Sequence, residues 1–274
     1  MAIVHKLTSI LFFTIISFSI VHPENTVRGL LRSSNISPAD IYGKQWALII
    51  GINQYKDFPQ LKYAVEDAKS IKTLLSTQYG FPDENILLLL DEDATKIKIE
   101  DAFYNLSENA GPDDAVIVFF AGHGVTEPAL GGTEDLGYLI PVDGKQKSLH
   151  RSSLDMKTIN IHSSAIPAKS ILFLVDACYG GLAAVGQYRS NRKYDYIKNL
   201  TKDRSRQIIT AGKKNEQVVE NEKWQHSAFT KVLLEGLMEL KADTDEDGII
   251  IANQLYSFIQ SNVLILTEGK QNPQ

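Results

Sequence analysis

Cysteine is nearly absent from this chain: its 274 residues include one, Cys178. A single thiol excludes an intrachain disulfide framework and any C-x-x-C metal or redox motif. A lone cysteine is often just a small buried hydrophobe, so a chemical role needs support from its surroundings. Here the apolar run of ILFLVDACYGG (171–181) leads to Cys178, and two glycines follow it.

An excess of positive charge is also absent, since 28 Lys and Arg stand against 33 Asp and Glu, a net charge of -5. We therefore expect no nucleic-acid partner, because such binding usually needs a broad basic face. The 43% hydrophobic and 22% charged content is that of an ordinary globular protein. The length allows one large domain or two small ones. Internal repeats and low-complexity tracts are absent as well.

Charge is missing between Lys6 and Glu24, over LTSILFFTIISFSIVHP (7–23). A basic start followed by roughly 15 mostly apolar residues is typical of a secretory signal, and a spanning helix needs about 20. No A-x-A cleavage site follows. We predict a signal peptide or an uncleaved N-terminal anchor over residues 1–22, with a buried helix as the alternative. The protein is expected to be secreted or exported, and any membrane contact would run through this segment.

Residues 23–44 are polar, contain two prolines and show no hydrophobic periodicity. We interpret them as a linker or short pro-segment, followed by one domain over residues 45–264.

From Gln45 onward, short apolar runs alternate with amphipathic segments. The runs predict strands at 46–52, 85–90, 113–124, 136–142, 170–177 and 206–212. The amphipathic segments predict helices at 61–80, 94–111, 152–165, 227–241 and 252–264. This alternation indicates an α/β fold with a mostly parallel central sheet and helices on both faces. No G-x-G-x-x-G follows the first strand, which argues against a Rossmann-type nucleotide enzyme.

Two chemically useful side chains follow two of these strands. His123 comes after AVIVFFAG and Cys178 after ILFLVDA. Ligands bind outside the carboxyl ends of parallel strands, so we expect the imidazole and the thiol at one edge of the sheet. A thiol with a pKa near 8.5 is mostly protonated at neutral pH, and an adjacent imidazole makes it a thiolate. A structural histidine is the alternative for His123.

Glycines surround both residues. Gly122 lets the loop turn, and Gly124 leaves its backbone N–H unobstructed. That N–H and the one of Cys178 are predicted to bind the oxyanion of a tetrahedral intermediate. The arrangement suits acyl transfer, most simply hydrolysis of a peptide bond.

FFAGHG (119–124) and DACYGG (176–181), with 55 residues from the histidine to the cysteine, resemble the catalytic motifs of the caspase-like cysteine peptidases. The metacaspase and orthocaspase branch is the most similar. ALIIGINQYKDFPQLKYAVEDAKSI (47–71) resembles the family's first strand and helix, and GYLIPVDG and SAFTKVLLEGL resemble later segments. The resemblance covers roughly residues 45–260. It implies a caspase-like three-layer sandwich.

The resemblance implies an endopeptidase that needs no cofactor and acts on proteins or peptides. His123 would be the general base and Cys178 the nucleophile, with the amides of Gly124 and Cys178 as the oxyanion hole. No third side chain that orients His123 is identified. Two other functions stay open: a catalytically silent interaction module, and a peptidase specific for Asp.

Substrate specificity follows from charge. Caspases hold a P1 aspartate with arginines, whereas metacaspase-like members cut after Arg or Lys and line the S1 pocket with two aspartates. These match Asp67 and Asp176 here, and no arginine lies near either motif. Two carboxylates favour a guanidinium, so we predict cleavage after basic residues. A solvated Asp67, with Glu66 as a competing acid, is the alternative.

The segment 186–207 contains seven Lys and Arg residues and two Asp residues. An enzyme with basic P1 preference would be able to cut itself there. An exposed charged loop explains the composition equally well.

DTDEDGIIIANQ (243–254) has the spacing of an EF-hand loop in Asp243, Asp245 and Asp247. Gln254 stands where a bidentate Glu is expected, and an acidic turn between two helices is the alternative. An aspartate-rich insertion after G-H-G, common in calcium-dependent metacaspases, is also missing. Calcium therefore stays a candidate ligand and not a requirement.

Overall fold

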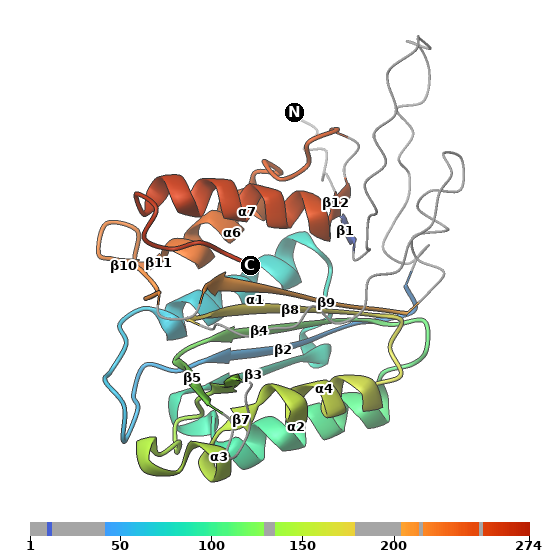
Figure 1. The fold of residues 1–274 in the computed structure, drawn as a ribbon. Helices are drawn as coiled ribbons and strands as arrows, with labels where there is room; N and C mark the ends of the chain where they lie inside the picture. Colours follow the sequence, from blue (N-terminus) through green and yellow to red (C-terminus); the bar gives the residue numbers. More distant parts are fainter. Residues whose placement is uncertain (1–9, 13–41, 129–134, 179–203, 214–215, 247–248) are drawn as a thin grey trace, which may run out of the picture.

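A computed structural model describes residues 10–12, 42–128, 135–178, 204–213, 216–246 and 249–274. Its centre is a sheet of five parallel strands in the order β3-β2-β4-β8-β9 (Figure 1). The strands are β2 (Gln45–Gly51), β3 (Ile86–Leu90), β4 (Ala115–Ala121), β8 (Ser170–Cys178) and β9 (Ser205–Gly212). From β2 the chain goes first to β3 on one side and then to β4 on the other, so the order of connections reverses between β2 and β4. Parallel sheets open a crevice at such a point.

Helices cover both faces of this sheet, so the predicted three-layer α/β fold is confirmed (Figure 1). One face carries α1 (Ala64–Gln78), α6 (Ala228–Met238) and α7 (Ala252–Leu266). The other carries α2 (Lys96–Asn109) and α4 (Met156–Ala165), beside the short α3 (Leu149–Ser152).

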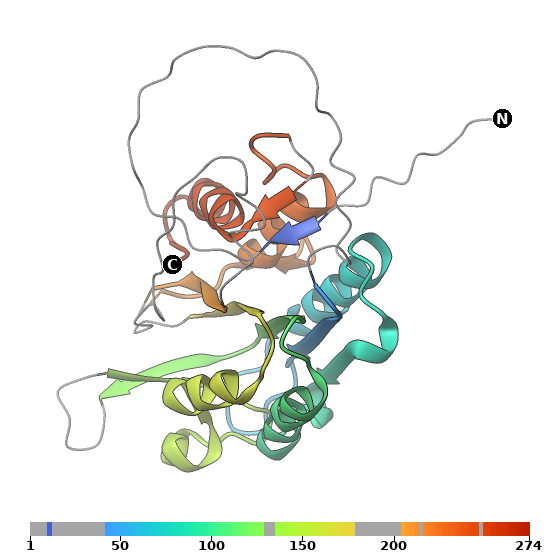
Figure 2. The same cartoon turned by 90° about the vertical axis from the view of Figure 1, so that its right-hand side faces the viewer.

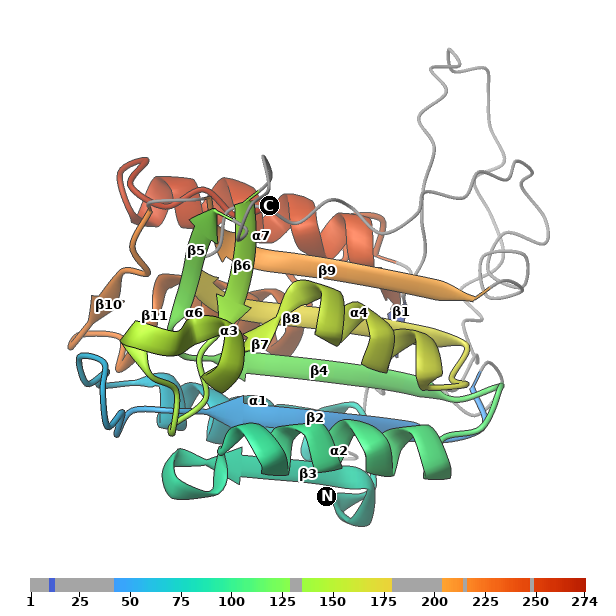
Figure 3. The ribbon, with the colours of Figure 1, turned by 60° about the horizontal axis from the view of Figure 1, so that its bottom comes forward.

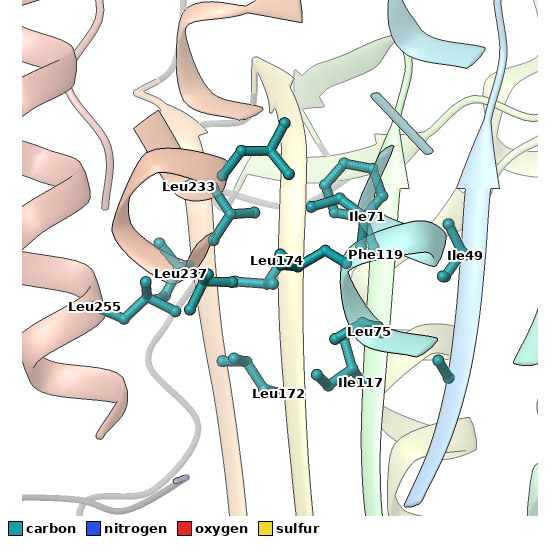
Figure 4. Close-up of a cluster of buried hydrophobic side chains, with 14 of the residues drawn as sticks. Ile49, Ile71, Leu75, Ile117, Phe119, Leu172, Leu174, Leu233, Leu237 and Leu255 are labelled. Carbon is teal, nitrogen blue, oxygen red and sulfur yellow. The ribbon is translucent and has the colours of Figure 1, made fainter. Parts of the chain in front are cut away.

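The alternation of side chains along each strand builds two cores. On β4, Ile117 and Phe119 point to the α1/α6/α7 side, where they meet Leu174 and Leu233 (Figure 4). Val118 and its alternate neighbours point to the α2/α4 side. Each fully buried side chain of this size contributes about 1.5–3 kcal/mol. Burial on both faces explains why the strands read as continuous apolar runs.

Short antiparallel pieces complete the domain, and the sequence did not predict their pairing. A three-stranded sheet contains β5 (Gly124–Pro128), β6 (Asp135–Leu139) and β7 (Leu154–Asp155) (Figure 3). The strand predicted at 136–142 is β6, and it pairs antiparallel with β5. A second ribbon joins β10 (Glu220–Asn221) to β11 (His226–Ser227).

Two predicted boundaries were wrong for local reasons. The strand predicted at 113–124 ends at Ala121, and β5 begins at Gly124. The helix predicted at 152–165 begins at Met156, because the side chain of Asp155 accepts a hydrogen bond from Thr158 N at 2.9 Å and caps it.

Near the N-terminus, β1 (Ile10–Phe12) pairs in parallel with β12 (Ile249–Ile251), blue beside red in Figure 2. The remainder of 1–22 and residues 23–41 lie outside the described residues, so the signal, anchor and linker assignments stay predictions. Within the part of the chain that is described, no helix is both long and apolar enough to span a bilayer.

The contact between α1 and β2 leaves no room for a side chain at Gly51. A Cβ there would lie 2.5 Å from the carbonyl oxygen of Ala64 and 2.6 Å from the Cβ of Ala68. We predict that Gly51→Ala pushes α1 away from the sheet and destabilises the fold by about 1–3 kcal/mol. Thermal denaturation measures the loss.

Gly111→Ala is the matched control, since the nearest atoms to its new Cβ lie at 3.6 Å, an ordinary contact. Equal melting temperatures for the two variants would contradict close packing at Gly51.

Candidate active site

A cavity of about 580 Å³ opens at the carboxyl ends of the central strands. Its walls come from the segment after β2, the start of α1, the ends of β4 and β8, and the chain around β10 and β11. It therefore lies where parallel sheets place ligands. Its lining includes Pro59, Asp67, His123, Asp176, Glu216, Glu220 and Ser227.

His123 lies at this cavity, between β4 and β5, and its ring is oriented by a backbone carbonyl. Its Nε2 lies 2.7 Å from the carbonyl oxygen of Pro59. A carbonyl only accepts, so Nε2 carries the hydrogen and Nδ1 of the neutral ring keeps its lone pair. The third group that the sequence could not identify is thus a main-chain atom, and it leaves Nδ1 as the basic nitrogen.

The hydroxyl of Tyr55 holds the backbone of His123 in place. Its hydroxyl accepts a hydrogen bond from His123 N at 2.8 Å and donates one to the carbonyl of Ile140 at 3.0 Å. The two rings also contact each other, with centroids 4.7 Å apart. A Cβ on Gly122 would collide with the Tyr55 hydroxyl, so this glycine is required by close approach. Burial raises the pKa of Tyr55, which keeps the hydroxyl protonated.

The environment of His123 favours its neutral form. Burial lowers the pKa of the imidazole, and the hydrogen bond to Pro59 and the charge of Glu220 oppose this effect. A neutral imidazole at neutral pH is the form that accepts a proton.

Cys178 is the last residue of β8, so the strand extends one residue beyond the predicted end at 177. Ala121 of β4 stands opposite Asp176 of β8, and Gly122 N donates to the carbonyl of Asp176 at 3.2 Å. Each reactive residue follows its member of this pair by two positions. The backbone therefore brings both strand-to-loop junctions to one edge of the sheet. The oxyanion role of the Gly124 and Cys178 amides stays a prediction.

Asp176 is buried at the base of the cavity, with 3% of its surface exposed. Alternation along β8 points it to the α1/α6 side, and a β-bulge places Asp176 and Ala177 against one residue of β9. Its Oδ2 accepts hydrogen bonds from the hydroxyls of Ser227 and Thr230. Its Oδ1 is buried and has no partner among the described residues. Burial, and then the charge of Asp67, raise the pKa of Asp176 to about 8.

Asp67 lies on the buried stripe of α1, with 1% of its surface exposed, whereas Glu66 is exposed. The alternative of a solvated Asp67 is therefore wrong. Its Oδ1 lies 2.6 Å from Nδ1 of His226, and its Oδ2 accepts from Ser227 N at 3.3 Å. Burial raises the pKa of Asp67 to about 6, and the hydrogen bond with His226 opposes the rise.

The dipeptide His226–Ser227 holds the two aspartates together, and the sequence analysis missed it. Ser227 donates its backbone N–H to Asp67 and its hydroxyl to Asp176. The same hydroxyl accepts from Thr230 N at 2.9 Å and so caps α6. The helix-capping pattern was visible in the sequence, but nothing local showed that the cap also binds carboxylates.

Two further acids line the cavity and were also missed. Glu220 accepts from the backbone amides of Lys62 and Tyr63, at 3.4 and 3.2 Å. Glu216 accepts from two other amides, each at 2.8 Å. None of the described lining residues is a lysine or an arginine. The described lining of the cavity thus contains four acidic residues, Asp67, Asp176, Glu216 and Glu220.

The predicted calcium segment is only partly described. Gln254 accepts from Ile251 N at 2.9 Å and donates its amide to Asp245 Oδ1 at 2.8 Å, so it binds the loop as a donor. Asp247 lies outside the described residues, while Asp243 and Asp245 lie in the turn between α6 and β12. Over the ranges described, no three His, Cys, Asp or Glu residues gather to hold a metal ion. Calcium binding by Asp243, Asp245 and Asp247 stays a prediction.

The end of the basic segment 186–207 lies in the central sheet. Residues 186–203 lie outside the described residues, but 205–207 belong to β9. The guanidinium of Arg206 donates to the carbonyls of Ile166 and Ser205, both at 2.9 Å. Arg206 is therefore a structural residue and no part of an exposed loop.

The family model described as the caspase domain matches residues 44–274. Metacaspase-1A of Aspergillus oryzae is 33% identical over 150 residues, which cover 52% of this chain and 35% of that protein. Metacaspase-1A of Aspergillus terreus is 32% identical over 164 residues, which cover 57% and 40%. The matched region spans less than half the length of these relatives.

The fold also resembles a solved structure. The crystal structure of a protein from Geobacter sulfurreducens superimposes with a TM-score of 0.57 at 17% sequence identity. The match covers 84% of this chain and 92% of that one. At this identity the likeness supports the fold alone.

The raised pKa of Asp176 has a consequence for stability. Folding raises this pKa from 3.8 to about 8, so the folded state binds the proton more tightly than the unfolded chain. The stabilisation is full below about pH 4 and is lost as the pH rises toward about 8, by at most about 1.4 kcal/mol per pH unit. We predict that Asp176→Asn, which is always neutral, removes this loss.

Thermal denaturation of the two proteins from about pH 5 to about pH 8 measures the difference, which should widen with pH. Asp101→Asn, at an exposed position on α2, is the control and should melt in parallel with the parent. A constant difference between Asp176→Asn and the parent would show that Asp176 is ionised throughout.

Proposed function

The chain belongs to the caspase-domain family, and from this premise we propose that it is a metacaspase-type cysteine endopeptidase that cuts after Arg or Lys. The observation that carries the chemistry is the orientation of His123. Because Nε2 donates to Pro59, Nδ1 is the nitrogen free to take a proton.

In the proposed mechanism, His123 removes the proton of the Cys178 thiol, and the thiolate attacks the carbonyl carbon of the scissile bond. The backbone amides of Gly124 and Cys178 stabilise the oxyanion that forms. His123 then gives its proton to the leaving amine, which departs and leaves a thioester. Water, deprotonated by His123, hydrolyses the thioester and restores the thiol.

The charge of the cavity supports the basic P1 preference. Asp176 Oδ1 is buried without a partner among the described residues, and Asp67 lies on the same side of the cavity floor. A guanidinium or ammonium would donate to this oxygen and relieve the cost of burying two carboxylates. A P1 aspartate would add a further negative charge to a cavity whose described lining offers no lysine or arginine.

Three further points are proposals, each with its own test. Basic residues of the segment 186–207 other than the structural Arg206 would be sites of self-cleavage, Asp243, Asp245 and Asp247 would bind calcium, and residues 1–22 would direct export. The first two are tested by sequencing new N-termini and by adding calcium or a chelator. The third is tested by locating the full chain in a secreting host.

We predict that the full chain cleaves fluorogenic peptides with Arg or Lys at P1 and leaves P1 Asp uncut. Cys178→Ala and His123→Ala should each lower kcat/KM by about 1,000-fold or more, because thiol and base act as one unit. His150→Ala, at an exposed histidine on α3, is the control and should keep full activity.

Cleavage after Asp would contradict the basic P1 preference and support the Asp-specific peptidase. A folded protein that cuts none of the three substrates, with or without calcium, would favour the interaction module.

We predict that Tyr55→Phe lowers kcat by about 10- to 100-fold and changes KM by less than about threefold, since small misplacements of a catalytic group are costly. Tyr55 is a positioning residue: its hydroxyl holds the His123 backbone. Steady-state kinetics on a P1 Arg peptide separates kcat from KM.

Tyr79→Phe is the matched control, because its buried hydroxyl also donates to a carbonyl, that of Leu237 at 3.0 Å, within the α1/α6/α7 core. The two variants should lose similar stability, and only Tyr55→Phe should lose kcat. Equal kcat for both would remove Tyr55 from the catalytic geometry.

A further inference from the structure

A titratable side chain is in contact with one of the two pocket aspartates. His226, on β11, places its Nδ1 2.6 Å from Asp67 Oδ1. The other oxygen of Asp67 is held by a backbone amide, that of Ser227, whose charge state never changes. One carboxylate oxygen of Asp67 therefore has a donor of constant charge, and the other has a donor whose charge depends on its protonation.

The hydrogen bond defines the proton positions on His226. Asp67 as a carboxylate only accepts, so Nδ1 of His226 carries the hydrogen and Nε2 of the neutral ring has a free lone pair. The side chain of His226 is 19% exposed, whereas that of Asp67 is 2% exposed. Solvent protons can thus reach the imidazole while the carboxylate it contacts is shielded. An imidazole gains its second proton between about pH 5 and 8.

The other charges around the pair are mostly negative. β8 supplies Asp176 and β10 supplies Glu220, whose charge acts on both Asp67 and Asp176. The ammonium of Lys62 pairs with Glu222 at the surface, where Nζ and Oε1 lie 3.1 Å apart. Among the described residues, His226 is the side chain in contact with Asp67 that can add a positive charge.

We propose that His226 is a positioning residue that sets the affinity of the pocket for a cationic P1 side chain according to its own protonation. The neutral ring orients Asp67 and leaves its negative charge available to a substrate guanidinium or ammonium. The imidazolium pairs with that charge and competes with the substrate cation. The proposal rests on the basic P1 preference proposed above, and it makes binding of a substrate cation compete with the second proton of His226.

Acid also protonates Asp67 and Asp176, whose pKa values are raised by burial, and this weakens cation binding in the same direction. The contribution of His226 therefore appears as a difference between variants. His226→Gln keeps an N–H donor for Asp67 and cannot take a second proton. If His226 must lose its proton for the cation to bind, the dissociation constant of the parent rises up to about tenfold more per pH unit than that of His226→Gln.

The test measures benzamidine binding by titration calorimetry from about pH 5 to about pH 8. Benzamidine is a single arginine-like cation whose charge is constant over this range. The full chain carries Cys178→Ala, so that self-cleavage cannot interfere. The proteins are this parent, His226→Gln and, as control, His150→Gln at an exposed histidine. We expect a steep loss of affinity with acid in the parent and the control, and a shallower loss in His226→Gln.

A second variant guards against misfolding of the first. Asp67→Asn removes the charge that the imidazolium would neutralise, so adding His226→Gln to it should change the pH slope no further. Steady-state kinetics on the active enzyme is an independent test. His226→Gln should change the pH dependence of KM for a P1 Arg peptide and leave the pH dependence of kcat as it is.

The outcomes separate the two proposals. Equal slopes in the parent and His226→Gln would overturn the role of His226 and leave the basic pocket intact. Absence of benzamidine binding at every pH would overturn the basic pocket, and the role of His226 with it.

Discussion

The site depends on one costly arrangement, two carboxylates buried beside each other at the base of a cavity. An isolated buried carboxylate is so unfavourable that proteins neutralise it or surround it with donors. Here Asp67 and Asp176 come from α1 and β8, and both are held by residues at the start of α6. The N-terminus of a helix carries partial positive charge, which adds to the effect of the hydroxyl donors. α6 therefore has two roles: its apolar face packs in the core, and its first turn holds the acids of the pocket.

The same burial acts in opposite directions on the acids and the base. Loss of water disfavours every charged form, so it raises the pKa of Asp176 and lowers the pKa of His123. Without a substrate, the cavity thus favours a neutral imidazole and at least partial protonation of its floor. A cation entering the pocket reverses this balance for the acids, because it stabilises their ionised forms. Binding of a cation would therefore also change the protonation states of the two acids.

The central architecture could be predicted from the sequence because its signals are local and repeated. Runs such as that of β4 are short, continuous and rich in β-branched and aromatic residues, which favours a strand covered on both faces, and α1 shows its buried stripe by spacing. That stripe contains Asp67, so its burial was readable from the positions of Ala64, Ala68 and Ile71 around it. The junctions after β4 and β8 follow from the same reasoning.

The supporting groups could not be read in this way, for physical reasons. Pro59 orients His123 through a main-chain oxygen, and a backbone atom has no sequence signature. The β10–β11 ribbon has two residues in each strand, too few for any periodicity. Its contact with Asp67 joins residues 159 positions apart, which only the folded chain brings together.

The proposed specificity acid and the proposed nucleophile lie on the same strand, β8. Asp176 of the pocket and Cys178 of the chemistry are two residues apart on one central strand, roughly 6–7 Å along its axis. The β-bulge at this point places one extra residue of β8 opposite β9, between Val175 and Cys178. Under the proposed function, the P1 side chain would enter the cavity beside the scissile bond and meet the buried carboxyl of Asp176. A cationic P1 side chain would have the charge that this carboxyl pairs with, whereas a P1 aspartate would add a second negative charge beside it.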